Sequence, residues 1–160
     1  MIEFAKSTKP PEAEQQFRVI GYGLGLIATG MAVAQMVSFE EFVAALRDYA
    51  LTGERGAVAL AIALISLEVF SVPFLFRLSL SPLARLLSAL FVVIAPCVWA
   101  VLVFAALMGD VQVPNAGLFG GFLSSLPFDL AVAFVAAWAA TVGFVFSRLG
   151  GYKALKPKKF

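Results

Sequence analysis

The chain has 160 residues, of which 61% are hydrophobic and only 14% are charged, and its formal net charge is +2. This charge is too small to indicate a nucleic-acid partner. The absence of histidine removes the commonest general base and the commonest metal ligand. A single cysteine, Cys97, cannot form an intramolecular disulfide or a two-thiol redox centre. We therefore predict no metal site, no cofactor and no catalytic residue, and the sequence favours a protein that is not an enzyme.

Four long apolar runs determine the class of the protein. They cover residues 18–37, 57–78, 82–108 and 127–147. A helix rises about 1.5 Å per residue, so about 20 apolar residues cross the roughly 30 Å hydrocarbon core of a bilayer. The sequence predicts an all-α polytopic membrane protein with one domain, a bundle of four transmembrane helices. Residues 1–16 form a short tail, and residues 148–160 form a basic tail.

The first loop carries the signals of a short helix. Ser38 and Glu41 match the S-x-x-E pattern of a capping box. Apolar residues follow at helical spacing, namely Phe39, Phe42, Val43 and Leu46. We predict an amphipathic helix that lies at the outer membrane surface, followed by Tyr49 as an interfacial aromatic residue.

Basic residues predict the orientation in the membrane. Most of them lie in the two tails or beside the turn between the second and third spans, where Arg77 and Arg85 stand. Only Arg47 and Arg55 lie on the opposite side. The positive-inside rule then places both termini in the cytoplasm. We predict a bacterial inner-membrane protein in contact with membrane lipids.

Two spans carry stripes of small residues. In the first span they are Gly21, Gly25, Ala28 and Ala32, and in the fourth they are Ala136, Ala140 and Gly143. Helices in lipid associate through close packing, which small residues permit. The simplest interpretation places both stripes at helix–helix contacts within the bundle. The alternative is a contact with another membrane protein subunit.

Glu68 is the most unusual residue, because it lies near the middle of the second span. A charge at the bilayer centre costs at least about 2.5–3.5 kcal/mol. We expect its side chain to face the bundle interior, either protonated or paired with Gln35, Tyr22 or Arg85. Two interpretations remain open: a functional acid, or a hydrogen-bonded carboxyl group that joins helices. Arg85 is better explained as an anchor at the membrane surface.

Three further residues lie deep in the spans. Cys97, Trp99 and Trp138 are predicted to be packing residues of the core. An inert structural role is expected for Cys97, because an apolar environment disfavours the thiolate.

The third loop, residues 109–126, is unusually apolar. Leu118, Phe119 and Phe122 do not suit a free loop, and its glycines and Asn115 imply a tight path with positive φ angles. We predict that this segment folds back against the outer mouth of the bundle.

The order of these features resembles the DoxX/MauE superfamily of small four-span membrane proteins. The likeness covers roughly residues 17–147. It includes the glycine-rich first span, the segment 38–49, Leu67–Glu68, Ala84–Arg85 and the loop before the fourth span.

The loop is the most specific part of this resemblance. Related proteins of the MauE type often carry a motif like N-C-G-C-F-G, whereas residues 115–120 read N-A-G-L-F-G. Asn115, Gly117, Phe119 and Gly120 keep the frame, while Ala116 and Leu118 occupy the two cysteine positions. The resemblance implies an association with periplasmic thiol–disulfide chemistry, but neither replacement can take part in thiol–disulfide exchange.

Three functions are compatible with these observations. The first is a non-catalytic accessory or structural subunit of a larger membrane complex, built on a DoxX/MauE-like scaffold. The second is a maturation factor linked to thiol–disulfide chemistry that acts through the cysteines of a partner. The third is a small-molecule or proton pathway centred on Glu68. We expect the functional residues among Glu68, Arg85, Asn115, Gly117, Phe119 and Gly120.

Overall fold

The computed structural model describes residues 12–49, 53–109, 111 and 113–147. In this part of the chain, five α-helices and one short 3₁₀-helix form the fold, which confirms the predicted all-α class. In chain order they are α1 (Glu12–Val37), α2 (Phe39–Asp48), α3 (Glu54–Leu75), α4 (Pro82–Met108), the 3₁₀-helix η1 (Pro114–Gly117) and α5 (Phe128–Ser147).

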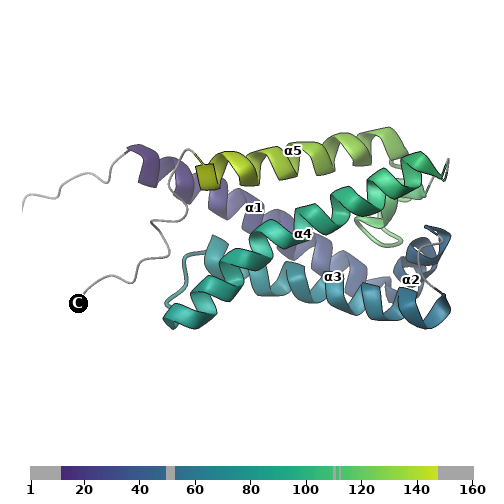
Figure 1. Cartoon of the computed structure of the whole chain (residues 1–160), viewed down its shortest axis with the longest axis horizontal. Helices are drawn as coiled ribbons and strands as arrows, with labels where there is room; N and C mark the ends of the chain where they lie inside the picture. Colours follow the sequence, from purple (N-terminus) through teal and green to yellow (C-terminus); the bar gives the residue numbers. More distant parts are fainter. Residues whose placement is uncertain (1–11, 50–52, 110, 112, 148–160) are drawn as a thin grey trace, which may run out of the picture.

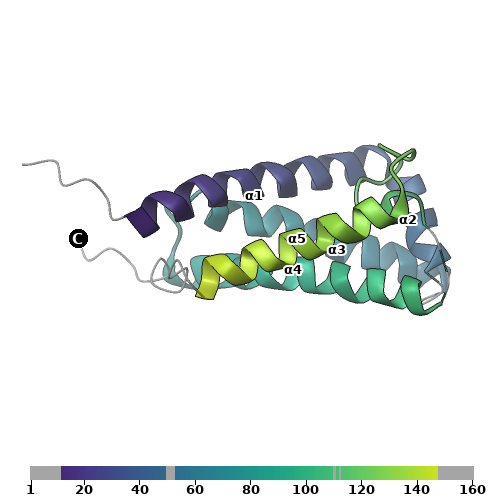
Figure 2. The same cartoon turned by 90° about the horizontal axis from the view of Figure 1, so that it is seen from above.

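Four of these helices, α1, α3, α4 and α5, are long and apolar enough to cross a membrane. They run alongside one another in alternating directions (Figures 1 and 2). α3 packs against α1 on one side and α4 on the other, while α5 packs mainly on α4. α1 begins and α5 ends at the same end of the bundle, which we call the terminal end (Figure 1). The opposite end, called the loop end, carries α2 and η1.

The boundaries of two spans differ from those predicted. α1 begins at Glu12, so part of the segment expected to be a tail is helical. α3 ends at Leu75, because the chain turns at Arg77, whose φ of 55° is incompatible with a continuing right-handed helix. Ser81 then caps α4 by accepting a hydrogen bond from the amide of Ala84.

Close contact between α1 and α3 depends on the small residues of α1. Gly21, Gly25, Ala28 and Ala32 are all buried. A Cβ atom at Gly21 would lie only 3.1 Å from the carbonyl oxygen of Leu75 in α3. The backbones of the two helices therefore approach each other at a point where a larger residue has no room.

The small residues of α5 lie elsewhere. Ala136, Ala140 and Gly143 are exposed, and a Cβ atom at Gly143 would meet no heavy atom within 4 Å. The prediction that they form a contact within this bundle is therefore wrong. The residues that α5 buries against the bundle are a different set: Ala131, Val135, Trp138, Val142 and Val145. The buried residues and the exposed small residues lie on different faces of α5, because each residue turns a helix by about 100°.

The predicted amphipathic helix is present as α2. Its apolar residues Phe42, Val43 and Leu46 are buried, and α2 packs against α3 and η1. The predicted capping box is wrong, because the Ser38 side chain makes no capping hydrogen bond. The Ser38 hydroxyl instead donates to the carbonyl of Ala34. α2 thus covers the loop end of the bundle with its apolar face turned inward.

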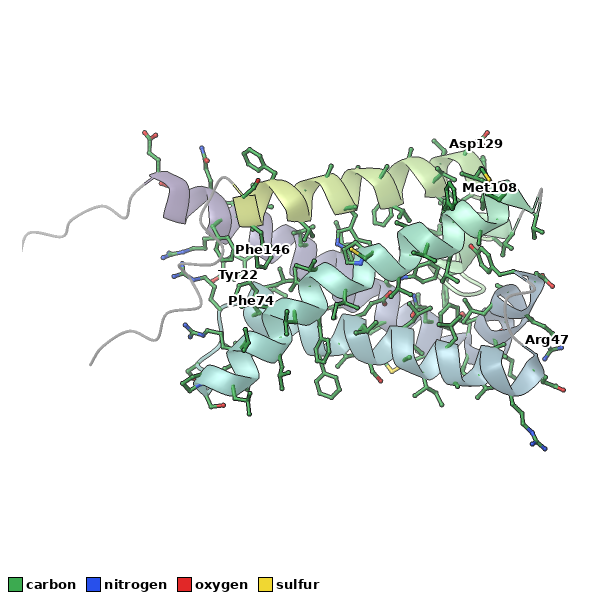
Figure 3. All side chains as sticks on the ribbon, viewed as in Figure 1. Tyr22, Arg47, Phe74, Met108, Asp129 and Phe146 are labelled. Carbon is green, nitrogen blue, oxygen red and sulfur yellow. The ribbon has the colours of Figure 1, made fainter. Side chains whose placement is uncertain are left out.

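Aromatic rings close the terminal end. Phe74 of α3 contacts Phe17 of α1 edge-on at 5.9 Å and stacks on Phe146 of α5 at 6.0 Å between ring centroids. In Figure 3, Phe74 and Phe146 lie toward this end, whereas Met108, Asp129 and Arg47 lie at the loop end. These ring contacts connect α3 to both α1 and α5. They supplement the few contacts that α5 makes directly with α1.

Candidate functional site

Glu68 lies in the interior of the bundle with no exposed surface. Its Oε1 atom accepts two hydrogen bonds. The indole Nε1 of Trp99 donates the first over 2.9 Å, and the amide Nε2 of Gln35 donates the second over 3.2 Å. This carboxyl group therefore joins α3 to both α1 and α4.

The periodicity of the helices brings these three side chains together. Gln35 continues the buried stripe of α1, three residues after Ala32. Glu68 continues the buried face of α3, four residues after Leu64. Trp99 follows Ala95 on the buried face of α4 at the same interval. Each polar residue thus replaces an apolar one on a helix face that already points inward.

Gln35 extends the cluster to the third loop. Its Nε2 atom also donates a hydrogen bond to the backbone carbonyl of Leu118 over 2.8 Å. Two acceptors surround this atom, so the orientation of the amide is fixed by its partners: only the NH₂ group can supply both hydrogens. Leu118 itself is completely buried. A single amide group therefore links the loop at η1 to the acid in the middle of α3.

Asn115 shapes the loop around this contact. Its Nδ2 atom donates to the carbonyl oxygens of Phe122, over 2.8 Å, and Gly120, over 3.3 Å. Its backbone amide donates to the carbonyl of Leu126 over 3.1 Å. Asn115 has a φ of 43°, a left-handed conformation that asparagine tolerates better than most residues. The side chain thus holds the segment 115–126 in a compact turn. Leu118 is buried as the predicted folding back requires, whereas Phe122 is exposed.

A second connection joins the loop to the start of α2. The backbone amide of Gly121 donates to the Ser38 hydroxyl over 2.7 Å. Gly120 has a φ of 56°, and a Cβ atom at this position would collide with the Ser38 hydroxyl. Gly120 is therefore required both by its backbone conformation and by the close approach of Ser38.

The predicted site residues divide into two groups. Glu68, Asn115, Gly117 and Gly120 are buried and belong to the cluster or to the loop that covers it. Phe119 is half-buried and contacts Phe134 of α5 at 6.0 Å between ring centroids. The remaining candidate, Arg85, lies half-buried in the first turn of α4.

Some predicted partners of Glu68 need correction. Of the candidates, Gln35 does bond to Glu68, whereas Tyr22 is exposed and contacts the ring of Phe76. Trp99 is more than the packing residue predicted, because it donates to Glu68. A signal was present in the sequence: a buried indole N–H needs an acceptor, and Glu68 is an acceptor in the neighbouring span. Cys97 is exposed on α4, not buried in the core as predicted.

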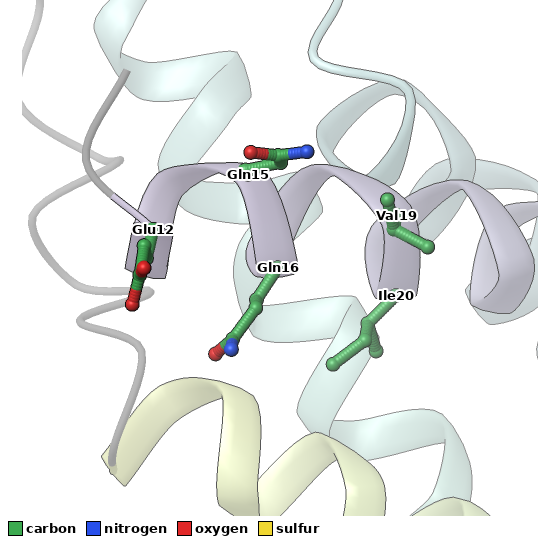
Figure 4. A pocket seen from close by; sticks show the side chains of 5 residues that line it. All are labelled: Glu12, Gln15, Gln16, Val19 and Ile20. Carbon is green, nitrogen blue, oxygen red and sulfur yellow. The ribbon is translucent and has the colours of Figure 1, made fainter. Parts of the chain in front are cut away.

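The arrangement can hold a carboxyl group among neutral hydrogen-bond donors and couple it to a loop. Among the described residues, no three His, Cys, Asp or Glu side chains lie close enough to hold a metal ion. A hollow at the terminal end is separate from the cluster and is lined by residues of α1 alone (Figure 4): Glu12, Gln15, Gln16, Val19 and Ile20.

Comparisons with known proteins identify no relative of this chain. No family model matches the chain, and neither the curated proteins nor the solved structures contain a significant match. The resemblance to the DoxX/MauE superfamily therefore stays a prediction from the sequence.

Proposed function

We propose that this protein is a non-catalytic accessory subunit of a larger membrane complex, built on a DoxX/MauE-like four-helix scaffold. The observation that carries this proposal is the use of Glu68. Its Oε1 atom receives hydrogen bonds from α1 and α4, and Gln35 passes the connection on to the loop. Glu68, the buried acid of the bundle interior, thus joins helices and has a structural role in this proposal.

The exposed face of α5 supports the same proposal. Ala136, Ala140 and Gly143 give this helix a surface with little side-chain bulk, and none of the helices that the structure describes covers it. Small residues at such positions allow a second membrane helix to approach closely. A subunit of a complex needs such a surface, whereas a self-sufficient bundle does not.

The turn at the loop end offers a second surface. Phe122 and Leu123 are 51% and 58% exposed, although Asn115 holds the turn that carries them. Leu123 has a φ of 55°, which is strained for a leucine. A rigid turn that presents apolar side chains is suited to contact with a partner.

The orientation belongs to this proposal as well. The terminal end carries Arg18, Arg77 and Arg85, whereas Arg47 (Figure 3) and Arg55, at the start of α3, lie at the loop end. By the positive-inside rule, the terminal end lies in the cytoplasm of a bacterial cell and the loop end faces outward. Labelling of single cysteines at Asp129 and at Glu12 with a membrane-impermeant reagent, in a Cys97→Ser background, tests this orientation in intact cells.

Purification from the native membrane tests the function. The tagged protein is solubilised in a mild detergent, its apparent mass is measured, and every co-migrating protein is identified by mass spectrometry. We expect a stoichiometric assembly much larger than one 17.0 kDa chain. A lone bundle or a homo-oligomer would contradict the proposal.

The same experiment separates the alternative functions. Co-purification of an oxidoreductase with a reactive cysteine pair would support the maturation factor, since Ala116 and Leu118 leave thiol chemistry to a partner. A protein that purifies alone would direct attention to Glu68 as part of a pathway. In that case Glu68→Gln would abolish activity and leave the fold intact.

A further inference from the structure

The interior cluster contains more hydrogen-bond acceptors than donors. Gln35 and Trp99 contribute three N–H hydrogens, two from the amide and one from the indole. All three are used, by Glu68 Oε1 twice and by the Leu118 carbonyl once. Two acceptors then receive no hydrogen bond from any residue that the structure describes, and these are Gln35 Oε1 and Glu68 Oε2.

These two oxygens belong to groups that already touch. The Nε2 atom of Gln35 lies 3.2 Å from the Oε1 atom of Glu68, so the amide and the carboxyl group are direct neighbours. Both side chains are 0% exposed. A buried acceptor that receives no hydrogen bond destabilises the fold, because it has lost its bonds to water. A hydrogen on Oε2 of Glu68 would turn one of these two unbonded acceptors into a donor.

The neutral groups around Glu68 also favour a hydrogen on its carboxyl group. The groups bonded to this cluster are an amide from α1, an indole from α4 and a backbone carbonyl from the loop. None of these groups carries a charge, and none titrates. The charged side chains of α2, which also packs on α3, are all exposed. An ionised carboxylate would leave one bare oxygen and a net charge in the interior of a span, where ions are costly.

We propose that Glu68 is a structural proton-binding site, in which the carboxyl group is neutral and carries its proton on Oε2. Oε1 is then the carbonyl oxygen that accepts from Trp99 and Gln35, and Oε2–H is the donor that the Gln35–Glu68 pair otherwise lacks. The bound proton stabilises the folded protein. It balances the cluster, so that the second hydrogen of Gln35 remains available to the Leu118 carbonyl and holds the loop.

Infrared spectroscopy of the full chain in lipid bilayers tests this proposal. We expect the wild type to show a carbonyl-stretch band of a protonated carboxylic acid that shifts in D₂O and disappears in Glu68→Gln. This variant keeps the size of the side chain and offers an N–H donor in place of the proton. Loss of a carboxylate band in Glu68→Gln, with no carboxylic-acid band in the wild type, would overturn the proposal.

A second variant keeps the test decisive if Glu68→Gln does not fold. Trp99→Phe removes one of the two donors to Oε1, so the carbonyl band must move to higher frequency. Trp138→Phe is the matched control, since Trp138 lies in α5 and no hydrogen bond joins it to Glu68 in the described structure. A band that stays in place in Trp99→Phe, or moves equally in both variants, would show that it does not arise from Glu68.

Discussion

The indole of Trp99 donates a hydrogen bond to Oε1 of Glu68 over 2.9 Å, and both side chains are completely buried. Trp99 lies in α4 and Glu68 in α3, so this contact is a second directional link between the two helices, beside the Ser88 hydroxyl of α4, which donates to the carbonyl of Phe70 over 2.6 Å. Phe42 of α2 contacts the same indole at 6.2 Å between ring centroids. Trp99 thus connects the interior acid to the helix that covers the loop end.

Removal of this hydrogen bond should destabilise the protein. We expect Trp99→Phe to lower the free energy of unfolding by about 0.5–1.5 kcal/mol more than Trp138→Phe, because the buried Oε1 atom of Glu68 loses one of its two donors. Both substitutions remove a similar volume from a buried position, so the difference isolates the hydrogen bond. Reversible unfolding in mixed micelles measures both values. Equal losses would show that Trp99 contributes by packing alone.

Gln35 should control the position of the loop. In Gln35→Leu, the carbonyl of Leu118 and the carboxyl group of Glu68 lose their common donor. We expect faster amide hydrogen exchange in residues 115–126, with little change at the terminal end of the bundle. Val33→Leu is the control, because Val33 is 49% exposed on the same helix. Unchanged exchange in Gln35→Leu would contradict a role for the cluster in holding the loop.

A methyl group at Gly120 should be far more damaging than one at Gly143. At Gly120 it meets the Ser38 hydroxyl and requires a left-handed conformation, whereas at Gly143 it meets nothing within 4 Å. We expect Gly120→Ala to lower the melting temperature clearly. Gly143→Ala should leave it unchanged or raise it, since alanine favours a helix by about 1 kcal/mol over glycine. Similar melting temperatures for the two variants would exclude the tight contact at Ser38.

The contact between α1 and α3 offers a second matched pair on one helix. Gly21→Ala places a methyl group 3.1 Å from the carbonyl oxygen of Leu75, whereas Gly23→Ala meets no heavy atom within 4 Å. We expect only Gly21→Ala to force the helices apart and to lower thermal stability. The melting temperatures of the two purified variants in the same detergent provide the measurement. A loss in Gly23→Ala alone would contradict the assigned faces of α1.

Sequence periodicity predicted the four spans, α2 and the inward direction of Glu68, because each depends on spacing along one helix. Gln35 was among the expected partners for the same reason. The role of Trp99 was missed, since an aromatic residue in a span fits packing equally well. The small residues of α5 were predicted to face the bundle, but they are exposed. A stripe of small residues shows which face of a helix permits close packing and does not identify the helix that packs there.

Details of the loop depended on contacts that spacing does not encode. Ser38 and Glu41 match a capping box, yet the Ser38 hydroxyl bonds to Ala34 and to Gly121, which lies 83 residues away. Local pattern and tertiary contact compete for one hydroxyl group, and the tertiary contact determines the outcome. The glycines and Asn115 predicted a tight path, whereas the partners of Asn115 required the folded structure.

We propose that this bundle is a subunit whose exposed α5 face receives another membrane helix. The most direct measurement compares the mass of the assembly purified in mild detergent from cells that carry the wild type or the double variant Ala140→Leu, Gly143→Leu. Both positions are exposed, so we expect the variant to fold with wild-type stability and to lose its co-migrating partner. A variant that still purifies in the same larger assembly, or a wild type that purifies as a single 17.0 kDa chain, would contradict the account.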